Sequence, residues 1–162
     1  MSPRLRILTS SAMRHMCHRM GIQRISQPVF NEIRFFLFSW IGDVLLKLNE
    51  IMSYDDHKTT VTWEDVMKVL SPKIILRRRK VPRCRPNTPV LPNCFVFPVQ
   101  SFLRVLRLHT MDLEQNLRFT PEALTLLQFA LETYFAEKVK IAYENMTRAR
   151  RKTLFSEDFS TH

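Results

Sequence analysis

The chain has 162 residues, of which 45% are hydrophobic, and it carries 25 Lys and Arg against 15 Asp and Glu, a formal net charge of +10. This length allows one ordinary domain or two very small ones, the apolar content excludes a disordered basic tail, and the charge favours a polyanionic partner. The two glycines, Gly21 and Gly42, are too few for a glycine-rich phosphate loop, and no nucleophile motif or catalytic carboxylate pair is recognisable, so we expect neither an enzyme nor a cofactor.

The first half of the chain predicts a short, a long and another short helix. The first is expected over Ser10–Met20. Apolar residues then recur every 3.6 residues over Val29–Met52, which predicts a long helix with Ser26 as its N-cap and Pro28 just inside it. Such a helix is about 38 Å long, so it needs partners packed along both halves. A third helix is expected over Thr62–Leu70, with Thr62 as its N-cap.

The second half repeats this order. A short helix is expected over Pro98–His109. Thr120 is predicted to cap a long helix that has Pro121 at its first position, Glu132 on its polar face and an apolar stripe that continues to about Met146. Ser156 follows as a possible cap of a short remnant. Periodicity alone leaves an unrelated helical bundle open as the alternative.

Basic residues gather in three separate stretches, which suggests an extended ligand. No acid precedes Glu32, and the second and third stretches hold no carboxylate. On its own, the Arg77–Lys80 run is equally consistent with a solvated face or a nuclear-import signal. The three stretches contain Arg4, Arg6, Arg14, Arg19 and Arg24; Lys73, Arg77, Arg78, Arg79, Lys80, Arg83 and Arg85; and Arg148, Arg150, Arg151 and Lys152.

The three cysteines predict neither disulfides nor a metal site. Cys17, Cys84 and Cys94 stand at irregular spacing, which favours a reducing compartment. His15 and His18 flank Cys17, but no second cluster of ligands lies near them in the sequence, so we interpret all three as helix-face residues.

No membrane segment is expected. The most apolar stretch, Phe35–Leu46, is interrupted by Asp43 and is too short to span a bilayer. The N-terminus does not have the apolar core and small-residue cleavage site of a secretory signal. We expect a soluble, unsecreted protein with no membrane partner.

Against this background, the segment Leu8–Ser26, LTSSAMRHMCHRMGIQRIS, resembles the first helix and first loop of a histone-four-type core without a gap. Glu32 and Arg34 continue the match into the long helix, and VTWEDVMKVL at Val61–Leu70 is similar to the family's second loop and third helix. The residues that coincide in the first segment are Thr9, Ala12, Arg14, Arg19, Gly21, Arg24, Ile25 and Ser26.

The second half resembles a different histone. PRCRPNT at Pro82–Thr88 is similar to the arginine-proline segment that precedes the histone-three-type fold, Pro98 and Gln100 to the start of its first helix, and LRFT at Leu117–Thr120 to its first loop. The chain is shorter than that family between Thr88 and Pro98, which implies that DNA ends are held loosely. Further matches are Ala123, Leu127, Gln128, Glu132, Tyr134, Arg151, Thr153 and Asp158.

Together these resemblances imply a core histone doublet similar to those of large DNA viruses. The implied fold class is all-α, with two histone folds in one chain that form an intramolecular handshake heterodimer. Residues 1–72 would be the histone-four-type fold, residues 73–88 a basic connector, and residues 89–162 a histone-three-type fold with a truncated third helix. The implied function is to wrap and compact double-stranded DNA without base specificity, in a nucleus, a viral factory or the virion. The alternative is a histone-fold subunit of a transcription or replication complex that acts mainly through protein contacts.

The resemblance also implies site residues. Arg24 and Arg118 would enter the minor groove as first-loop arginines, next to second-loop phosphate contacts. The full set implied to contact DNA is Arg14, Arg19, Arg24, Lys58, Thr60, Arg77, Arg78, Arg79, Lys80, Arg83, Arg85, Arg104, Arg118, Arg150, Lys152 and Thr153.

Protein partners are implied as well. A second copy of the chain would be contacted through Arg148, Arg151 and Asp158, with an Arg148–Asp158 ion pair across the two-fold axis. Partner histones of the other pair type are expected too. The positions that would face them hold Lys47, Ile51, Tyr54 and Lys68, which leaves open whether a standard cellular histone fits.

Overall fold

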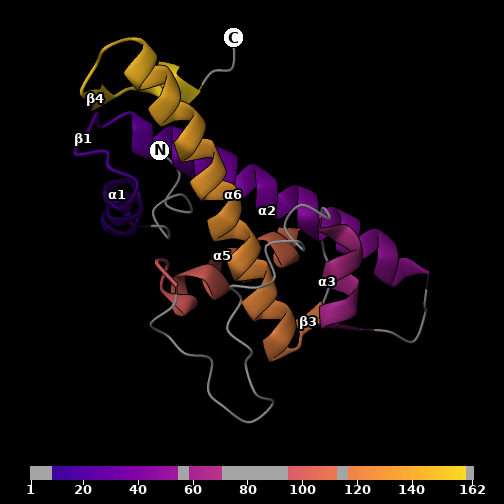
Figure 1. Cartoon of the computed structure of the whole chain (residues 1–162). Helices are drawn as coiled ribbons and strands as arrows, with labels where there is room; N and C mark the ends of the chain where they lie inside the picture. Colours follow the sequence, from indigo (N-terminus) through magenta and orange to yellow (C-terminus); the bar gives the residue numbers. More distant parts are fainter. Residues whose placement is uncertain (1–8, 55–58, 71–94, 113–116, 160–162) are drawn as a thin grey trace.

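Two long helices, α2 (Val29–Ser53) and α6 (Pro121–Arg148), cross each other in the computed structural model of the chain (Figure 1). The structure describes residues 9–54, 59–70, 95–112 and 117–159. The other elements within these ranges are the helices α1 (Ser10–Arg19), α3 (Trp63–Val69) and α5 (Val99–Asp112), the 3₁₀ helix η3 (Ser156–Phe159), and the two-residue strands β1 (Arg24–Ile25), β2 (Thr60–Val61), β3 (Arg118–Phe119) and β4 (Thr153–Leu154).

Two of the predicted caps are confirmed. The Thr120 hydroxyl accepts a hydrogen bond from the Ala123 backbone N–H at 3.3 Å, and Pro121 occupies the first position of α6. Thr62 donates its backbone N–H and its hydroxyl to the Asp65 carboxylate, at 2.9 and 2.8 Å, where α3 begins. Both caps satisfy donors that the first turn of a helix leaves without an intrahelical partner. The short–long–short order of each half is confirmed as well, although α5 begins at Val99 and continues beyond the predicted end to Asp112.

The predicted N-cap of the first long helix is wrong. α2 begins at Val29, the N-cap position is taken by Pro28 in a helical conformation, and no side chain caps the helix there. Ser26 instead donates its backbone N–H to the Leu154 carbonyl at 3.0 Å. Its backbone therefore extends the pairing between β1 and β4, a tertiary contact that local sequence cannot reveal.

Two small parallel sheets join loops that lie far apart in the sequence. In the first, β1 pairs with β4, and Arg24 stands opposite Thr153. In the second, β2 pairs with β3, and Thr60 stands opposite Arg118. Each sheet thus connects the loop before a long helix in one half with the loop after the long helix in the other. In Figure 1 the β1–β4 sheet and β3 lie at opposite ends of the crossed helices.

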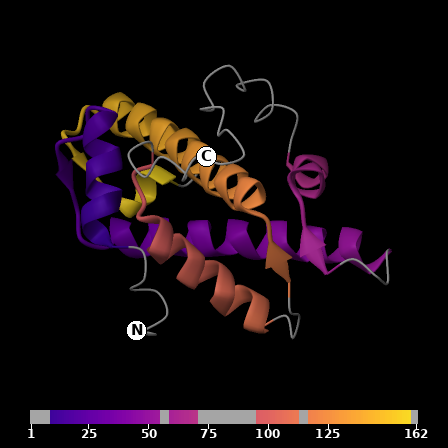
Figure 2. The same ribbon diagram turned by 90° about the horizontal axis from the view of Figure 1, so that it is seen from below.

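One short helix from each half also packs on the long helix of the other half. α5, from the second half, packs along α2, and α3, from the first half, packs on α6. Figure 2 shows α5 beside α2, with α1 near the start of the same helix. The apolar side chains of both halves form one core, in which Leu37 and Leu45 of α2 and Leu131 and Phe135 of α6 are fully buried. Each such side chain contributes about 1.5–3 kcal/mol by leaving water, so either half would expose a costly apolar face without the other.

An aromatic cluster marks the crossing of the two long helices. Phe36 of α2 has its ring centroid 6.0 Å from that of Tyr134, 6.3 Å from that of Phe135 and 5.5 Å from that of Phe159 in η3. Trp40 stacks on Tyr134 with a centroid separation of 5.5 Å. Because aromatic pairs in these geometries are favoured beyond the area they bury, the cluster helps fix where α2 and α6 meet.

Candidate nucleic-acid interface

The end of the molecule that holds β1 and β4 carries several exposed cations. Arg24 is exposed on β1, and its register partner Thr153 is half-buried on β4. Arg150 and Lys152, which precede β4, are exposed as well. Arg24, Arg150, Lys152 and Thr153 were all predicted from sequence to contact DNA, and the structure brings them together at one end.

Arg150 has an unusual backbone conformation. Its φ is 56°, in the left-handed region that glycine normally fills where a helix ends. Its backbone N–H donates to the Thr147 carbonyl at 2.9 Å and that of Arg151 to the Met146 carbonyl at 3.0 Å, which closes the last turn of α6. A non-glycine residue in this conformation costs roughly 1 kcal/mol. The chain therefore has an arginine at a position where glycine would be less strained.

The opposite end, at β2 and β3, repeats the arrangement with fewer described cations. Arg118 is exposed on β3 opposite the half-buried Thr60 on β2. The Arg118 N–H donates to the Thr59 carbonyl and the Thr120 N–H to the Val61 carbonyl, both at 3.1 Å. Each end of the molecule therefore presents one exposed arginine and one threonine on adjacent parallel strands.

The remaining predicted DNA contacts are distributed unevenly. Arg14 and Arg19 are exposed on α1, and the Arg14 guanidinium lies over the Phe30 ring, 5.5 Å from its centroid. Arg104 is exposed on α5, away from both strand pairs in the sequence. The other predicted residues, which fall outside the described ranges and stay predictions, are Lys58, Arg77, Arg78, Arg79, Lys80, Arg83 and Arg85.

A buried carboxylate supports the β1–β4 end from within. Asp158 is 2% exposed; it accepts hydrogen bonds from the Arg151 guanidinium and, at 2.9 Å, from the Phe155 N–H. The Asn145 amide of α6 donates to the Asp158 carbonyl at 2.8 Å. We call Asp158, Arg151 and Asn145 the Asp158 clamp, because together they hold β4 and η3 against α6.

The clamp changes the interpretation of the predicted self-association residues. Asp158 was expected to meet Arg148 of a second copy, but its carboxylate is buried and already bonded within its own chain. Arg151 is bonded to the same carboxylate and lies over the Phe155 ring, 5.1 Å from its centroid. Arg148 is exposed at the end of α6. Withdrawing Asp158 from the clamp would leave buried polar groups unpaired, which makes the predicted intermolecular pair unfavourable.

Sequence reasoning missed a second internal support, at Glu132. This residue was expected on the polar face of its helix, yet its carboxylate accepts hydrogen bonds from the backbone N–H groups of Val96 at 2.8 Å and Phe97 at 2.9 Å. Gln128, one turn earlier, donates its amide to the Phe97 carbonyl at 2.8 Å. Burial raises the pKa of the Glu132 carboxyl, while the two N–H donors act in the opposite direction. The two residues fix the start of α5, and the signal for them was the spacing of four residues that places both on one side of a helix.

The side chains that were considered as metal ligands around Cys17 lie apart from one another. Cys17 is fully buried, and burial raises the pKa of its thiol to about 12, whereas His15 and His18 are exposed. The three side chains therefore do not converge. Within the described ranges, no helix is long and apolar enough to cross a membrane.

Comparison with known proteins supports a histone fold. Residues 92–161 match the family model of the core histone domain, which describes all four core histone types. The crystal structure of the histone from Methanopyrus kandleri superimposes on the chain with a TM-score of 0.62, at 20% sequence identity, over 94% of this chain and 90% of that chain. Among curated proteins, none matches the sequence. The matched range falls inside the predicted second unit, residues 89–162, whose boundaries stay predictions. Residues 92–161 therefore form a histone-fold domain in a mostly helical chain with the architecture of a histone.

Proposed function

We propose that the chain is a single-chain histone doublet that wraps double-stranded DNA without reading its bases. The histone-four-type fold of residues 1–72 and the histone-three-type fold of residues 89–162 would pair as an intramolecular handshake. In support, α3 and α5 each pack on the long helix of the other half, and both halves contribute to one core.

The observation that carries the proposal is the register of the two strand pairs. Arg24 stands opposite Thr153 and Arg118 opposite Thr60, so an arginine and a threonine from different halves meet at each end. An arginine can enter a minor groove that faces the protein, while a threonine hydroxyl and nearby backbone N–H groups can bind phosphate. None of these contacts requires a particular base.

The spacing of the two ends suits a curved duplex. α2 separates β1 from β2 and has 25 residues, a length of about 37 Å. One helical turn of DNA is about 34–36 Å, so the two ends can meet neighbouring inward-facing minor grooves of one duplex. The N-termini of α2 and α6 follow β1 and β3, so each end also has the positive pole of one long-helix dipole.

A second copy and partner histones belong to the same proposal. Arg148 is exposed at the end of α6, and Ile141 and Tyr143 are 38% and 37% exposed on the same helix. With Asp158 held in the clamp, we expect only weak self-association, which DNA strengthens when it holds two chains side by side. We place the protein in a nucleus, a viral factory or the virion, on the resemblance to viral doublets alone.

A histone-fold subunit that acts mainly through protein contacts is the second candidate. The exposed Phe35 and Leu46 on α2 favour it, since exposed apolar side chains on a helix face suit a protein partner.

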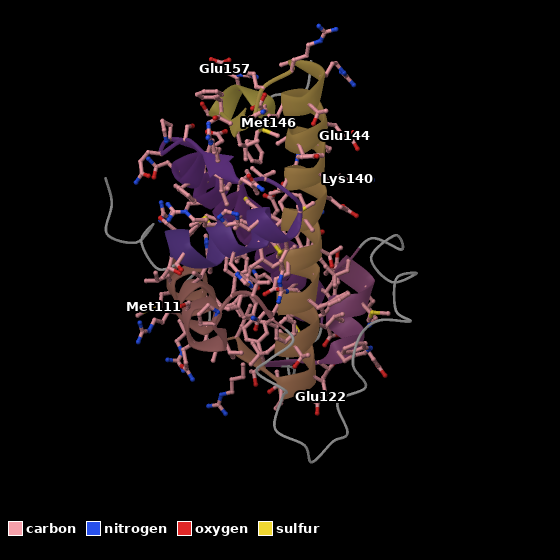
Figure 3. All side chains as sticks on the ribbon, turned by 60° about the vertical axis from the view of Figure 1, so that its left-hand side comes forward. Met111, Glu122, Lys140, Glu144, Met146 and Glu157 are labelled. Atoms are coloured by element: carbon pink, nitrogen blue, oxygen red, sulfur yellow. The ribbon has the colours of Figure 1, made fainter. Side chains whose placement is uncertain are left out.

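Nuclease digestion of DNA reconstituted with the whole protein tests the proposal. We expect protected fragments of defined length with wild type and their loss with the double variant Arg24→Glu and Arg118→Glu. Lys140→Glu is the matched control, because Lys140 is an exposed cation that projects outward from α6 and belongs to neither strand pair (Figure 3). Absence of protection by wild type at moderate salt would exclude wrapping and favour the second candidate, as would equal loss with Lys140→Glu.

A further inference from the structure

Phe155 is an exposed aromatic residue directly after β4. It is 39% exposed, whereas Leu154 before it is fully buried. Side chains alternate between the two faces of an extended chain, so Phe155 lies on the same face as Thr153, which stands opposite Arg24 in the parallel pair. The ring therefore lies beside the arginine and the threonine that are proposed to bind DNA at this end.

The position of this ring is fixed by the Asp158 clamp. The Phe155 N–H donates to the Asp158 carboxylate at 2.9 Å, and the Arg151 guanidinium lies over the ring, 5.1 Å from its centroid. Arg151 is itself fixed by its ion pair with Asp158. Because the ring is already ordered in the free protein, little side-chain entropy is lost when it contacts a ligand.

The opposite end of the molecule has a threonine in the equivalent place. Thr62 follows β2 as Phe155 follows β4, and its N–H donates to the Asp65 carboxylate at 2.9 Å. The Thr62 hydroxyl donates to this carboxylate as well, at 2.8 Å. Phenylalanine cannot make this second hydrogen bond and exposes an apolar ring instead, so stability alone would favour threonine at position 155.

The surroundings of Phe155 favour DNA over a second copy of the chain. The exposed cations at this end are Arg24, Arg150 and Lys152. They attract phosphate groups, and they would repel the same surface of a second copy. Glu157, an exposed acid in η3, lies 4.0 Å from the Arg151 guanidinium, which offsets its charge.

We propose that Phe155 is an apolar wedge that enters the minor groove beside Arg24 and partly unstacks one base step. Proteins that bind the minor groove frequently insert such a side chain and thereby bend the duplex. The inference rests on the proposed function and deepens it, because the wedge responds to how easily the DNA is deformed at one end and not to the identity of a base. Duplexes that are already weakly stacked should therefore be bound in preference.

Competition between duplexes of about two helical turns tests the wedge in the whole protein. One duplex is fully paired, and the other has a single central mismatch with 2-aminopurine beside it, whose fluorescence rises when the base is unstacked. We expect wild type to prefer the mismatched duplex by about tenfold, which corresponds to the stacking of one base on an aromatic ring. Binding should also raise the 2-aminopurine fluorescence.

Substitutions of the ring identify the group involved. Phe155→Thr, which introduces the residue of the other end, should lose the preference, while its affinity for the paired duplex and its salt slope change little. Phe155→Tyr keeps an aromatic ring and should keep the preference. Phe35→Thr is the matched control, because Phe35 is 69% exposed on α2 and belongs to neither strand pair, so this variant should behave like wild type. Circular dichroism should show the same helical content for all three variants.

The outcomes separate the wedge from the proposed function. Binding of both duplexes without a preference, or a preference that Phe155→Thr keeps, would overturn the wedge and leave DNA wrapping intact. If Phe155→Thr lowered self-association in sedimentation and left the preference unchanged, the ring would belong to a contact between copies and the wedge would be wrong. Absence of binding to either duplex would overturn the proposed function, and the wedge with it.

Discussion

The two ends of the molecule present similar side chains but are supported differently. At the β1–β4 end, Arg24 and Thr153 are supported by the Asp158 clamp, in which a buried carboxylate pairs with the half-buried Arg151 and accepts further hydrogen bonds. At the β2–β3 end, Arg118 and Thr60 lie beside α3, whose first turn is fixed by Thr62 and Asp65. Equivalent surface chemistry is thus held by unlike internal contacts, so the two ends should differ in how easily they are disrupted.

The largest effect is expected from breaking the clamp. Asp158→Ala removes the partner of Arg151 and the acceptor of the Phe155 N–H, which we expect to lower the free energy of unfolding by about 2–4 kcal/mol. Urea unfolding would measure this loss. Glu157→Ala is the control, because Glu157 is 85% exposed and lies 4.0 Å from Arg151, so its effect should be far smaller. Similar losses for both variants would contradict the clamp.

The corresponding change at the other end should cost less. Thr62→Ala removes the hydroxyl from the cap of α3, with an expected loss of about 1 kcal/mol in unfolding free energy. Hydrogen exchange should locate the loosening in α3 and leave β4 and η3 protected. Lys68→Ala serves as control, since Lys68 lies 3.8 Å from Asp65 but its side chain is 62% exposed. Exchange that rises equally at both ends would show that the ends are not independently supported.

Similarity of the surfaces can be tested through DNA binding. Arg24→Ala and Arg118→Ala should each weaken binding to duplexes of any sequence and reduce the salt slope by about one unit, with unfolding free energies unchanged. Because the residues lie at opposite ends, the double variant should show the sum of both effects. Loss of affinity for one sequence alone, with the salt slope intact, would identify the arginine as a base reader.

Substitutions of Arg150 can separate the effect of backbone strain on stability from the effect of charge on DNA binding. Arg150→Gly should stabilise the fold by up to about 1 kcal/mol, because glycine adopts a φ of 56° without strain, while binding to DNA weakens. Arg150→Ala removes the same charge but keeps the strained Cβ, so it should weaken binding without the gain. Thermal melts and DNA titrations of both variants provide the comparison, and equal melting temperatures would contradict the strain.

The smallest expected effect is a pH dependence of the unfolding free energy that comes from Glu132, a residue of neither strand pair. The raised pKa of Glu132 means that the folded protein holds this proton at a pH where the unfolded chain has released it. Its contribution to the unfolding free energy therefore falls as pH rises from the ordinary glutamate range through the raised value. Glu132→Gln keeps an acceptor for Val96 and Phe97 and should flatten this slope. An unchanged slope in urea titrations between about pH 4 and 7 would assign it to other groups.

Local sequence signals were sufficient for the helices. The long helices follow from apolar periodicity, and Thr62 and Thr120 are caps because their hydroxyls and their neighbours act within a few residues. Arg24, Arg118, Thr60 and Thr153 were placed at candidate sites by family resemblance, and periodicity could not have paired them.

Long-range contacts explain what sequence reasoning missed. Ser26 has the chemistry of an N-cap, but its N–H is taken by Leu154, more than a hundred residues later. Asp158 and Glu132 both look like surface carboxylates until the groups that they bind are known, and these groups are backbone N–H donors as well as a guanidinium. The spacing of Gln128 and Glu132 shows that they share one side of a helix, but a single sequence does not show which backbone groups a side chain binds.

The shared core has a consequence for how the protein behaves on dilution. In a dimer of separate subunits, folding and association are linked, so stability falls as the protein becomes scarce. Here the side chains that cover each other, such as Leu37 and Leu131, belong to one polypeptide. Their association is intramolecular, its stoichiometry is fixed at synthesis, and no excess of one half can accumulate. The fold should therefore persist at concentrations at which a two-chain counterpart would dissociate.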